Sequence, residues 1–355
     1  MPGHDIIVIG ASAGGVEAAT QLVRSLPADM PAAIFVVIHI AAHSNSVLPQ
    51  ILQRRGHLPA THPKEGEKIK HGQIYVAPPD FHLIIKPGYV SLAHGPKENR
   101  HRPAVDPLFR SAARIYKSRV VGVVLSGTLD DGTAGLLAIK KLGGIAIAQD
   151  LEEALYDGMP GSAIENVAVD YVLPIVEISK KLVHLAHESV ETEDNPVDSH
   201  PVDSQLAMET DMAELEMEAV QSQERPGKES PYSCPECGGV LWEINNSNFL
   251  RFRCRTGHAF SSESLLVEQS EALEQALWVA LRALKEQSGL SKKLAERAKA
   301  QNRPITAERF AERAQEADAR ADVIRRVLVQ GENQILNIDN LEANAENNDL
   351  ETDVS

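Results

Sequence analysis

A serine close to the start of the chain stands where a nucleophile would be placed. Ser12 is the centre of the pentapeptide GASAG, which follows the apolar run DIIVI and fits the G-x-S-x-G pattern. Small neighbours allow a sharp turn from a strand into a helix, where the backbone N–H groups of Ala13 and Gly14 would stabilise an oxyanion. A helix-capping serine is the alternative, and the pentapeptide alone does not distinguish the two.

The same glycines do not predict a dinucleotide site. The G-x-G-x-x-G pattern requires a glycine where this chain has Ser12, because only a glycine lets the backbone approach a pyrophosphate. The next apolar run ends in His39, without the acidic residue that binds a ribose hydroxyl. A serine-based chemistry is therefore favoured over nucleotide binding.

A base and a carboxylate for that chemistry follow two other apolar runs. His39 ends the run AIFVVIHI, which we expect to lie beside the first strand and to end at the same sheet edge. Asp130 and Asp131 follow the run VVGVVLSGTL, and either would orient the imidazole. A surface histidine and a helix-capping aspartate are the alternatives.

A second constellation, near residue 250, has the composition of a metal site. Cys234 and Cys237 are separated from Cys254 and His258 by sixteen residues, which is zinc-ribbon spacing. Four protein ligands close the coordination sphere, so we predict a structural zinc and no cofactor for catalysis. A disulfide with one spare cysteine is the less favoured alternative.

The elements that would position these residues alternate between strands and helices in the first half. This pattern predicts an α/β domain with a doubly wound, mostly parallel sheet, followed by a small zinc ribbon and an α-helical hairpin. The runs expected to form strands are DIIVIG, AIFVVIHI, GQIYVAPP, VVGVVLSG, GIAIAQD and VDYVLP.

The composition of the chain changes at several points, which we take as the boundaries of its predicted domains. We expect the catalytic domain to cover residues 1–187 and an acidic, disordered linker to cover residues 188–230. A zinc ribbon over 231–260, a helical hairpin over 261–331 and a disordered tail over 332–355 then follow.

The charge of the chain is concentrated in its second half. The net charge is −15, yet residues 1–187 carry 18 Lys and Arg against 17 Asp and Glu. A nucleic-acid partner needs a concentrated basic face, so none is expected. The longest apolar run, AAIFVVIHIAA, is too short to span a bilayer, and no signal peptide precedes it. We therefore expect a cytoplasmic protein without membrane insertion.

Several segments, taken in order, closely resemble the catalytic domain of the CheB-type protein-glutamate methylesterases. They include GASAGG, VVIHI, GPKENRHRPAVDPLF, VVLSGTLDDGTAGL and EALYDGMPGSAI. The resemblance implies hydrolysis of γ-glutamyl methyl esters on chemoreceptors and, in some members, deamidation of receptor glutamines. It implies Ser12, His39 and Asp131 as the catalytic residues, with Asp131 chosen over Asp130.

The resemblance also has limits. It suggests His101 and Arg102 at the rim of the substrate cleft, although structural roles are equally open, and Asp106 is expected to cap the next helix. The family commonly has threonine in place of Ala13 and Met-Gly-Asn at residues 128–130. The usual receiver domain is not found before the esterase strand, so control through an attached receiver is not expected.

The partners implied by the resemblance are methylated chemoreceptor-like proteins. One alternative is a non-catalytic signalling adaptor that binds receptors or histidine kinases through the C-terminal part. Another is an esterase for small molecules.

Overall fold

The fold is described from a computed structural model, which places residues 3–190, 201–214, 227–246 and 249–349. The chain forms two compact units, Met1–Val267 and Glu268–Ser355. Within the described residues, no helix has the length and apolar character needed to cross a membrane.

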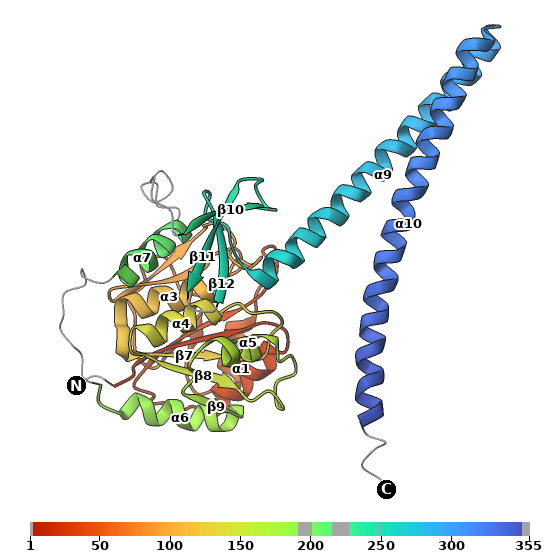
Figure 1. Ribbon diagram of the computed structural model, residues 1–355. Helices are drawn as coiled ribbons and strands as arrows, with labels where there is room; N and C mark the ends of the chain where they lie inside the picture. The colour runs from red at the N-terminus through yellow and green to blue at the C-terminus, as the bar shows by residue number, and fades with distance from the viewer. Residues whose placement is uncertain (1–2, 191–200, 215–226, 247–248, 350–355) are drawn as a thin grey trace. The chain divides into compact units, whose positions relative to one another are not determined.

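The first unit is built on a parallel sheet of seven strands in the order β3-β4-β2-β1-β7-β8-β9, of which β7, β8 and β9 are labelled in Figure 1. Helices cover both of its faces, so the predicted doubly wound α/β class is confirmed. The strands are β1 (Ile6–Ala11), β2 (Ala33–Ile38), β3 (Ala60–Thr61), β4 (Gln73–Val76), β7 (Val120–Val124), β8 (Ile145–Gln149) and β9 (Tyr171–Leu173).

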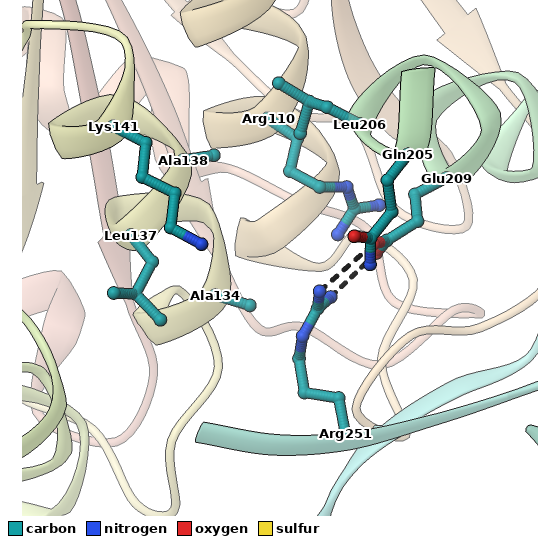
Figure 2. A pocket seen from close by; sticks show the side chains of 9 residues that line it. All are labelled: Arg110, Ala134, Leu137, Ala138, Lys141, Gln205, Leu206, Glu209 and Arg251. Carbon is teal, nitrogen blue, oxygen red and sulfur yellow. Dashed lines mark hydrogen bonds and ion pairs between the residues drawn. The ribbon is translucent and has the colours of Figure 1, made fainter. Parts of the chain in front are cut away.

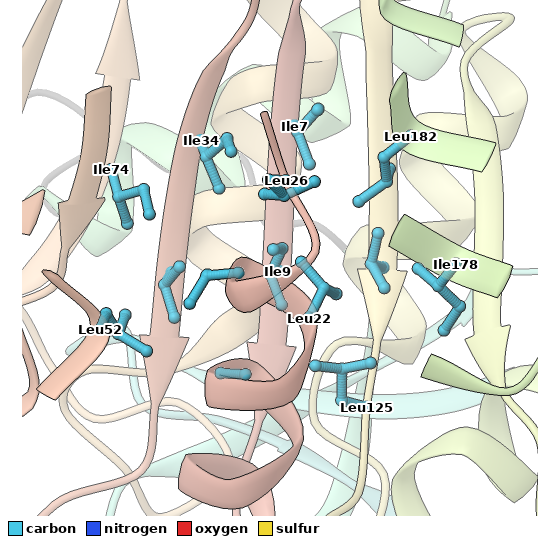
Figure 3. Close-up of a cluster of buried hydrophobic side chains, with 14 of the residues drawn as sticks. Ile7, Ile9, Leu22, Leu26, Ile34, Leu52, Ile74, Leu125, Ile178 and Leu182 are labelled. Atoms are coloured by element: carbon cyan, nitrogen blue, oxygen red, sulfur yellow. The ribbon is translucent and has the colours of Figure 1, made fainter. Parts of the chain in front are cut away.

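Each face of the sheet has its own hydrophobic core. Isoleucine and valine side chains alternate along the central strands, so each strand contributes to both cores. One face packs against α1 (Gly15–Arg24), α2 (Leu48–Arg55) and α6 (Ile175–His187), and Figure 3 shows the aliphatic side chains that fill this layer. The other face packs against α3 (Val105–Tyr116), α4 (Thr133–Lys141) and α5 (Gly158–Asn166).

All six of the expected strand runs form strands. A hairpin of β5 (His82–Lys86) and β6 (Tyr89–Ala93) was not predicted, and it forms a separate sheet of two antiparallel strands. Its residues Leu83, Ile85 and Val90 enter the core on the α3 side of the main sheet. The hairpin therefore extends a face that the helices alone do not cover.

The order of the strands creates a switch point next to β1. The chain passes from β1 to β2 on one side of it and returns as β7 on the other, and all three strands are parallel. The loops that follow these strands therefore meet at one edge of the sheet, where open α/β sheets bind their ligands.

The cysteine-rich segment forms a second, antiparallel sheet in the order β10-β11-β12-β13. We call residues 228–261, which hold these four strands, the cysteine module. Its small core contains Leu241, Phe252 and Phe260 together with two of the cysteines. The strands are β10 (Lys228–Ser233), β11 (Val240–Asn246), β12 (Phe249–Cys254) and β13 (Ala259–Ser261).

The structure departs from the predicted linker over residues 188–230. A helix, α7 (Pro201–Ala213), lies inside this range and packs on α3, and β10 begins at Lys228. The acidic residues that suggested a solvated spacer have basic partners far away in the sequence, because Asp211 pairs with Arg114 and Glu214 pairs with Lys86. The linker residues 191–200 and 215–226 lie outside the described residues.

The predicted boundaries at residues 187 and 230 do not separate compact units, because residues 1–267 pack together. Buried ion pairs join the cysteine module to α7 and to the segment before α3. Arg253 donates to Glu98 over 2.9 Å and Arg110 donates to the same carboxylate over 2.7 Å. Figure 2 shows Arg251 of β12 paired with Glu209 of α7, next to Arg110.

The second unit consists of two long helices, α9 (Ser262–Ala300), whose first residues belong to the first unit, and α10 (Pro304–Asp349). Lys292 of α9 donates to Asp318 of α10 over 2.7 Å, as expected of an antiparallel hairpin. The predicted disordered tail over 332–355 differs from the structure, in which α10 continues to Asp349 although this stretch is rich in Asn, which favours helices only weakly. Residues 350–355 lie outside the described part.

Candidate active site

The turn between β1 and α1 presents Ser12 at the carboxyl edge of the sheet. Gly14 adopts the left-handed conformation, with φ of 71°. A Cβ atom there would lie 2.7 Å from Ser126 Oγ, so both the backbone and the space favour glycine. Ser12 donates its backbone N–H to Ser126 O over 3.0 Å, which ties the turn to the end of β7.

Ser12, His39 and Asp131 lie in one hydrogen-bonded row. His39 Nε2 lies 2.7 Å from Asp131 Oδ2, and His39 Nδ1 lies 3.1 Å from Ser12 Oγ. An ionised carboxylate only accepts hydrogen bonds, so Nε2 carries the proton and Nδ1 is left to accept from the serine hydroxyl. The His39 side chain is 5% exposed, which keeps the row largely shielded from water.

Asp131 is held by an unusually complete set of donors. Burial opposes its ionisation, but the hydrogen bond from His39 and those from the surrounding N–H groups keep the pKa of Asp131 below its usual range. It accepts from His39 Nε2, from Asn99 Nδ2 and from the backbone N–H groups of Val105, Asp106 and Gly132. A charged acceptor is thereby fixed behind the imidazole.

Asp130 points elsewhere. Its Oδ1 accepts from the hydroxyl of Ser261 over 2.7 Å, on the cysteine module. Burial raises the pKa of Asp130 to about 7. Of the two adjacent aspartates, it is Asp131 whose carboxylate lies within hydrogen-bond distance of His39.

Asp106 does not cap α3 as expected. The helix α3 begins at Val105, and Ala104 occupies the capping position. The Asp106 side chain instead accepts from Gly135 N–H over 2.6 Å and from Asn99 Nδ2 over 3.0 Å. Burial and the nearby charge of Asp131 raise the pKa of Asp106 to about 7.

The two residues proposed for the rim line the cleft next to Ser12. This cleft has a volume of about 570 Å³ and is also lined by Ser12, Ala13 and His39. His101 stacks on His39 with ring centroids 3.6 Å apart, and burial and the neighbouring His39 lower the pKa of His101 to about 3. Arg102 is engaged with Asp80 over 2.5 Å and with Gly95 O over 2.6 Å.

The predicted oxyanion donors, Ala13 and Gly14, occupy the turn directly before the first residue of α1. Ala13 also lines the cleft, and its carbonyl accepts from Ser126 Oγ over 2.8 Å. Sequence reasoning missed Ser126 and Asn99, which brace the turn and Asp131. The only signal for Asn99 was its place in the segment GPKENRHRPAVDPLF, where no periodicity marks it.

The Cys3His group is brought together as the spacing predicted. The ligand atoms of Cys234, Cys237, Cys254 and His258 lie within 4.8 Å of one another. Sγ of Cys237 and Sγ of Cys254 are 3.7 Å apart, and His258 Nδ1 is 3.5 Å from Sγ of Cys254. A tetrahedral zinc site has edges of about 3.8 Å between sulfurs and about 3.6 Å between sulfur and nitrogen, so the group fits the ion.

Comparisons with known proteins agree on one family. The CheB methylesterase family model matches residues 7–182. The chain is 39% identical over 189 residues to a putative protein-glutamate methylesterase/protein-glutamine glutaminase of Leptospira interrogans, covering 53% of this chain and 98% of the relative. It is 40% identical over 184 residues to the protein-glutamate methylesterase/protein-glutamine glutaminase of Thermotoga maritima, covering 51% of this chain and 54% of that protein.

A solved structure is also similar. The crystal structure of the Thermotoga maritima CheB methylesterase catalytic domain aligns with a TM-score of 0.49 at 40% identity, covering 51% of this chain and 98% of that one. The matched segment contains Ser12, His39 and Asp131 and ends before the cysteine module. The Leptospira interrogans relative is matched over 98% of its length at 39% identity, and the chain therefore belongs to the CheB methylesterase family.

Proposed function

We propose that the protein hydrolyses γ-glutamyl methyl esters on chemoreceptor-like proteins, with Ser12, His39 and Asp131 as the catalytic triad. The observation that supports this most directly is the hydrogen-bonded row from Ser12 Oγ through His39 to Asp131 Oδ2. Membership in the methylesterase family supports the same reaction.

In the first half of the reaction Ser12 attacks the ester carbonyl. His39 Nδ1 takes the hydroxyl proton as the Oγ–C bond forms, and backbone N–H groups of Ala13 and Gly14 receive the oxyanion. Asp131 holds the Nε2–H tautomer and stabilises the imidazolium. When the tetrahedral intermediate collapses, the proton on Nδ1 passes to the methoxide oxygen and methanol leaves.

In the second half water hydrolyses the glutamyl-serine ester. His39 Nδ1 takes a proton from the attacking water and returns it to Ser12 Oγ, which releases a glutamate carboxyl group. With a glutamine side chain the leaving group is ammonia and the product is again glutamate. The same residues therefore support the glutaminase reaction named for the relatives.

The decisive experiment follows methanol release from a purified, methylated chemoreceptor. Ser12→Ala is expected to lower the rate by about 10⁴-fold or more, because a triad acts as a unit. Ser91→Ala is the matched control, since Ser91 lies on β6 away from the cleft and its hydroxyl donates to Glu65. Equal methanol release from wild type and Ser12→Ala would contradict the proposal.

We also propose that the Cys3His group binds one structural zinc ion. Four protein ligands leave no position for a substrate, and the ligand distances match a closed tetrahedral site. The ion would fix the two turns from which β11 and β13 begin.

A second candidate function is that of an adaptor for a histidine kinase. The observation that favours it is the set of exposed apolar side chains on the second unit, such as Leu273 at 62% and Val279 at 56% exposed. Binding of the full chain to a purified chemoreceptor-associated kinase should then weaken in a Leu273→Ser, Val279→Ser variant. Unchanged binding in that variant would exclude these residues as the contact.

A further inference from the structure

The segment that leads into α3 is joined to the cysteine module by its backbone. Asn99 N–H donates to Ala259 O over 2.8 Å, and Ala259 N–H donates to Lys97 O over 3.3 Å. Ala259 is the first residue of β13 and directly follows the metal-ligand candidate His258. The strand that leaves the Cys3His group is therefore the strand that holds Asn99.

The side chain of Asn99 is enclosed between the active site and the module. It is 6% exposed, and its backbone adopts a positive φ of 47°, which asparagine tolerates better than most residues. Its Nδ2 donates to Asp131 over 2.9 Å and to Asp106 over 3.0 Å. Its Oδ1 accepts from the backbone N–H of Ser261 over 3.0 Å and from the hydroxyl of Ser264 over 3.2 Å.

Donor and acceptor chemistry fixes which way this amide points. The ionised carboxylate of Asp131 accepts and cannot donate, so the amide nitrogen must face it. The backbone N–H of Ser261 donates and cannot accept, so the amide oxygen must face the module. Removing the module's donors would leave the orientation of Asn99 set from one side only.

Ser261 and Ser264 are themselves held in a reciprocal cap at the start of α9. Ser264 N–H donates to Ser261 Oγ over 3.0 Å, while Ser261 N–H lies 2.9 Å from Ser264 Oγ. Each hydroxyl then contacts a different residue of the catalytic part, Asp130 for Ser261 and Asn99 for Ser264. The cap is therefore a rigid support and not a loose surface contact.

We propose that Asn99 is a positioning residue for Asp131, and that β13 and the first turn of α9 hold it in place. The turnover of the esterase then depends on a segment that lies beyond the part of the chain matched by the methylesterase family. This inference rests on the proposed triad chemistry. Asn99 does not line the cleft, so it acts on the rate and not on substrate binding.

The test measures kcat and KM for methanol release with Asn99→Gly and Ser264→Ala in the full chain. Glycine accepts the positive φ, so Asn99→Gly removes the amide without straining the backbone. Loss of a hydrogen bond to a charged group is expected to lower kcat about tenfold to a hundredfold with KM unchanged. Ser264→Ala, which removes one of the supports of Asn99, is expected to lower kcat about threefold to tenfold.

The double variant separates positioning from general damage to the structure. If Ser264 acts through Asn99, Ser264→Ala has no further effect on kcat in the Asn99→Gly background. Ser230→Ala is the control, because its hydroxyl bonds Leu241 O inside the module, and its kcat is expected to stay within about twofold of wild type.

The outcomes distinguish this inference from the proposed function. If the wild type and Ser12→Ala release methanol at the same rate, the proposed function itself is overturned. If methanol release depends on Ser12 but kcat is unchanged in Asn99→Gly, only the role of Asn99 is overturned. Additive losses in the double variant overturn the link between Ser264 and Asn99, and should Ser264→Ala not fold, Asn99→Gly still tests the role of Asn99.

Discussion

At the residue scale, two adjacent aspartates have opposite surroundings. Asp131 accepts from His39, whereas Asp130 accepts from Ser261 on the cysteine module. An asparagine in place of Asp131 would present its amide N–H or a weaker acceptor to the imidazole and disturb the tautomer. The neighbouring position has no bond to the histidine.

We therefore expect Asp131→Asn to lower kcat for methanol release by about 10⁴-fold, and Asp130→Asn to change it by less than about tenfold. The two variants have the same change in composition at adjacent positions, so each serves as the control for the other. A larger loss of kcat in Asp130→Asn than in Asp131→Asn would contradict the choice of Asp131 as the triad carboxylate.

Asp130 also makes a prediction about stability. Its pKa is raised to about 7 in the folded chain by burial, while an unfolded aspartate has a pKa of about 3.9. Between these values the unfolded chain releases a proton that the folded chain keeps, so the free energy of unfolding falls as the pH rises. Asparagine at this position has no proton to release.

The free energy of unfolding of wild type should accordingly fall more steeply between pH 5 and 6.5 than that of Asp130→Asn, by up to about 1.4 kcal/mol per pH unit. Urea unfolding followed by Trp242 fluorescence in a Trp278→Phe background reports on the first unit alone. Parallel pH dependences for the two proteins would contradict the raised pKa of Asp130.

At the scale of elements, the Cys3His group is expected to hold one zinc ion per chain, measurable by elemental analysis of the purified protein. Cys254→Ser should lose most of the zinc and lower the thermal stability of the cysteine module, because metal binding supplies folding free energy in such small sheets. Thr256→Ala is the control, since this residue lies in the same turn and contacts Cys237 without being a ligand candidate. Equal zinc in both variants would exclude the site.

The central strands were predictable from sequence because their signal is local. A parallel strand buried on both faces needs a continuous apolar run, and the runs that became β1, β2, β7 and β8 have this character, whereas the edge strand β9 is partly exposed. The β5–β6 hairpin was not predicted from the sequence, and its two strands form a separate sheet outside the main one. Ser12 and His39 were placed at one edge by the ends of two runs, whereas the choice of Asp131 over its neighbour came from the family resemblance.

At the scale of the whole molecule, docking between distant segments was not predictable. The acidic residues of α7 suggested a solvated spacer, because residues 188–225 carry twelve Asp and Glu against one Arg. Their partners lie on other elements, as Arg251 does for Glu209. The charge composition of a segment describes only residues that are close in sequence. Ion pairing depends on which distant segments the fold brings together.

Glu98 is the central charge of this docking. It is 1% exposed and paired with Arg110 and Arg253, whose charges keep the pKa of Glu98 below its usual range despite burial. Glu98→Gln is expected to lower the free energy of unfolding of the first unit by about 3 kcal/mol, since it removes the buried carboxylate that Arg110 and Arg253 share. The Trp242 fluorescence assay measures this change.

Glu236→Gln is the matched control, because its pair with Lys97 also joins the module to the catalytic part but is partly exposed. Such exposed pairs contribute up to about 1 kcal/mol. Equal decreases in the free energy of unfolding of the two variants would mean that burial does not determine how much these ion pairs stabilise the first unit.

The backbone pairing between Asn99 and Ala259 also fixes an order of events during synthesis. Ala259 lies 86 residues after Leu173, the last residue of the main sheet. At about 5 to 20 residues per second, a ribosome needs about 4 to 17 s to add them. For that interval all strands of the parallel sheet have been synthesised while the segment before α3 still lacks its partner strand, so this backbone pairing forms only after residue 259 has been translated.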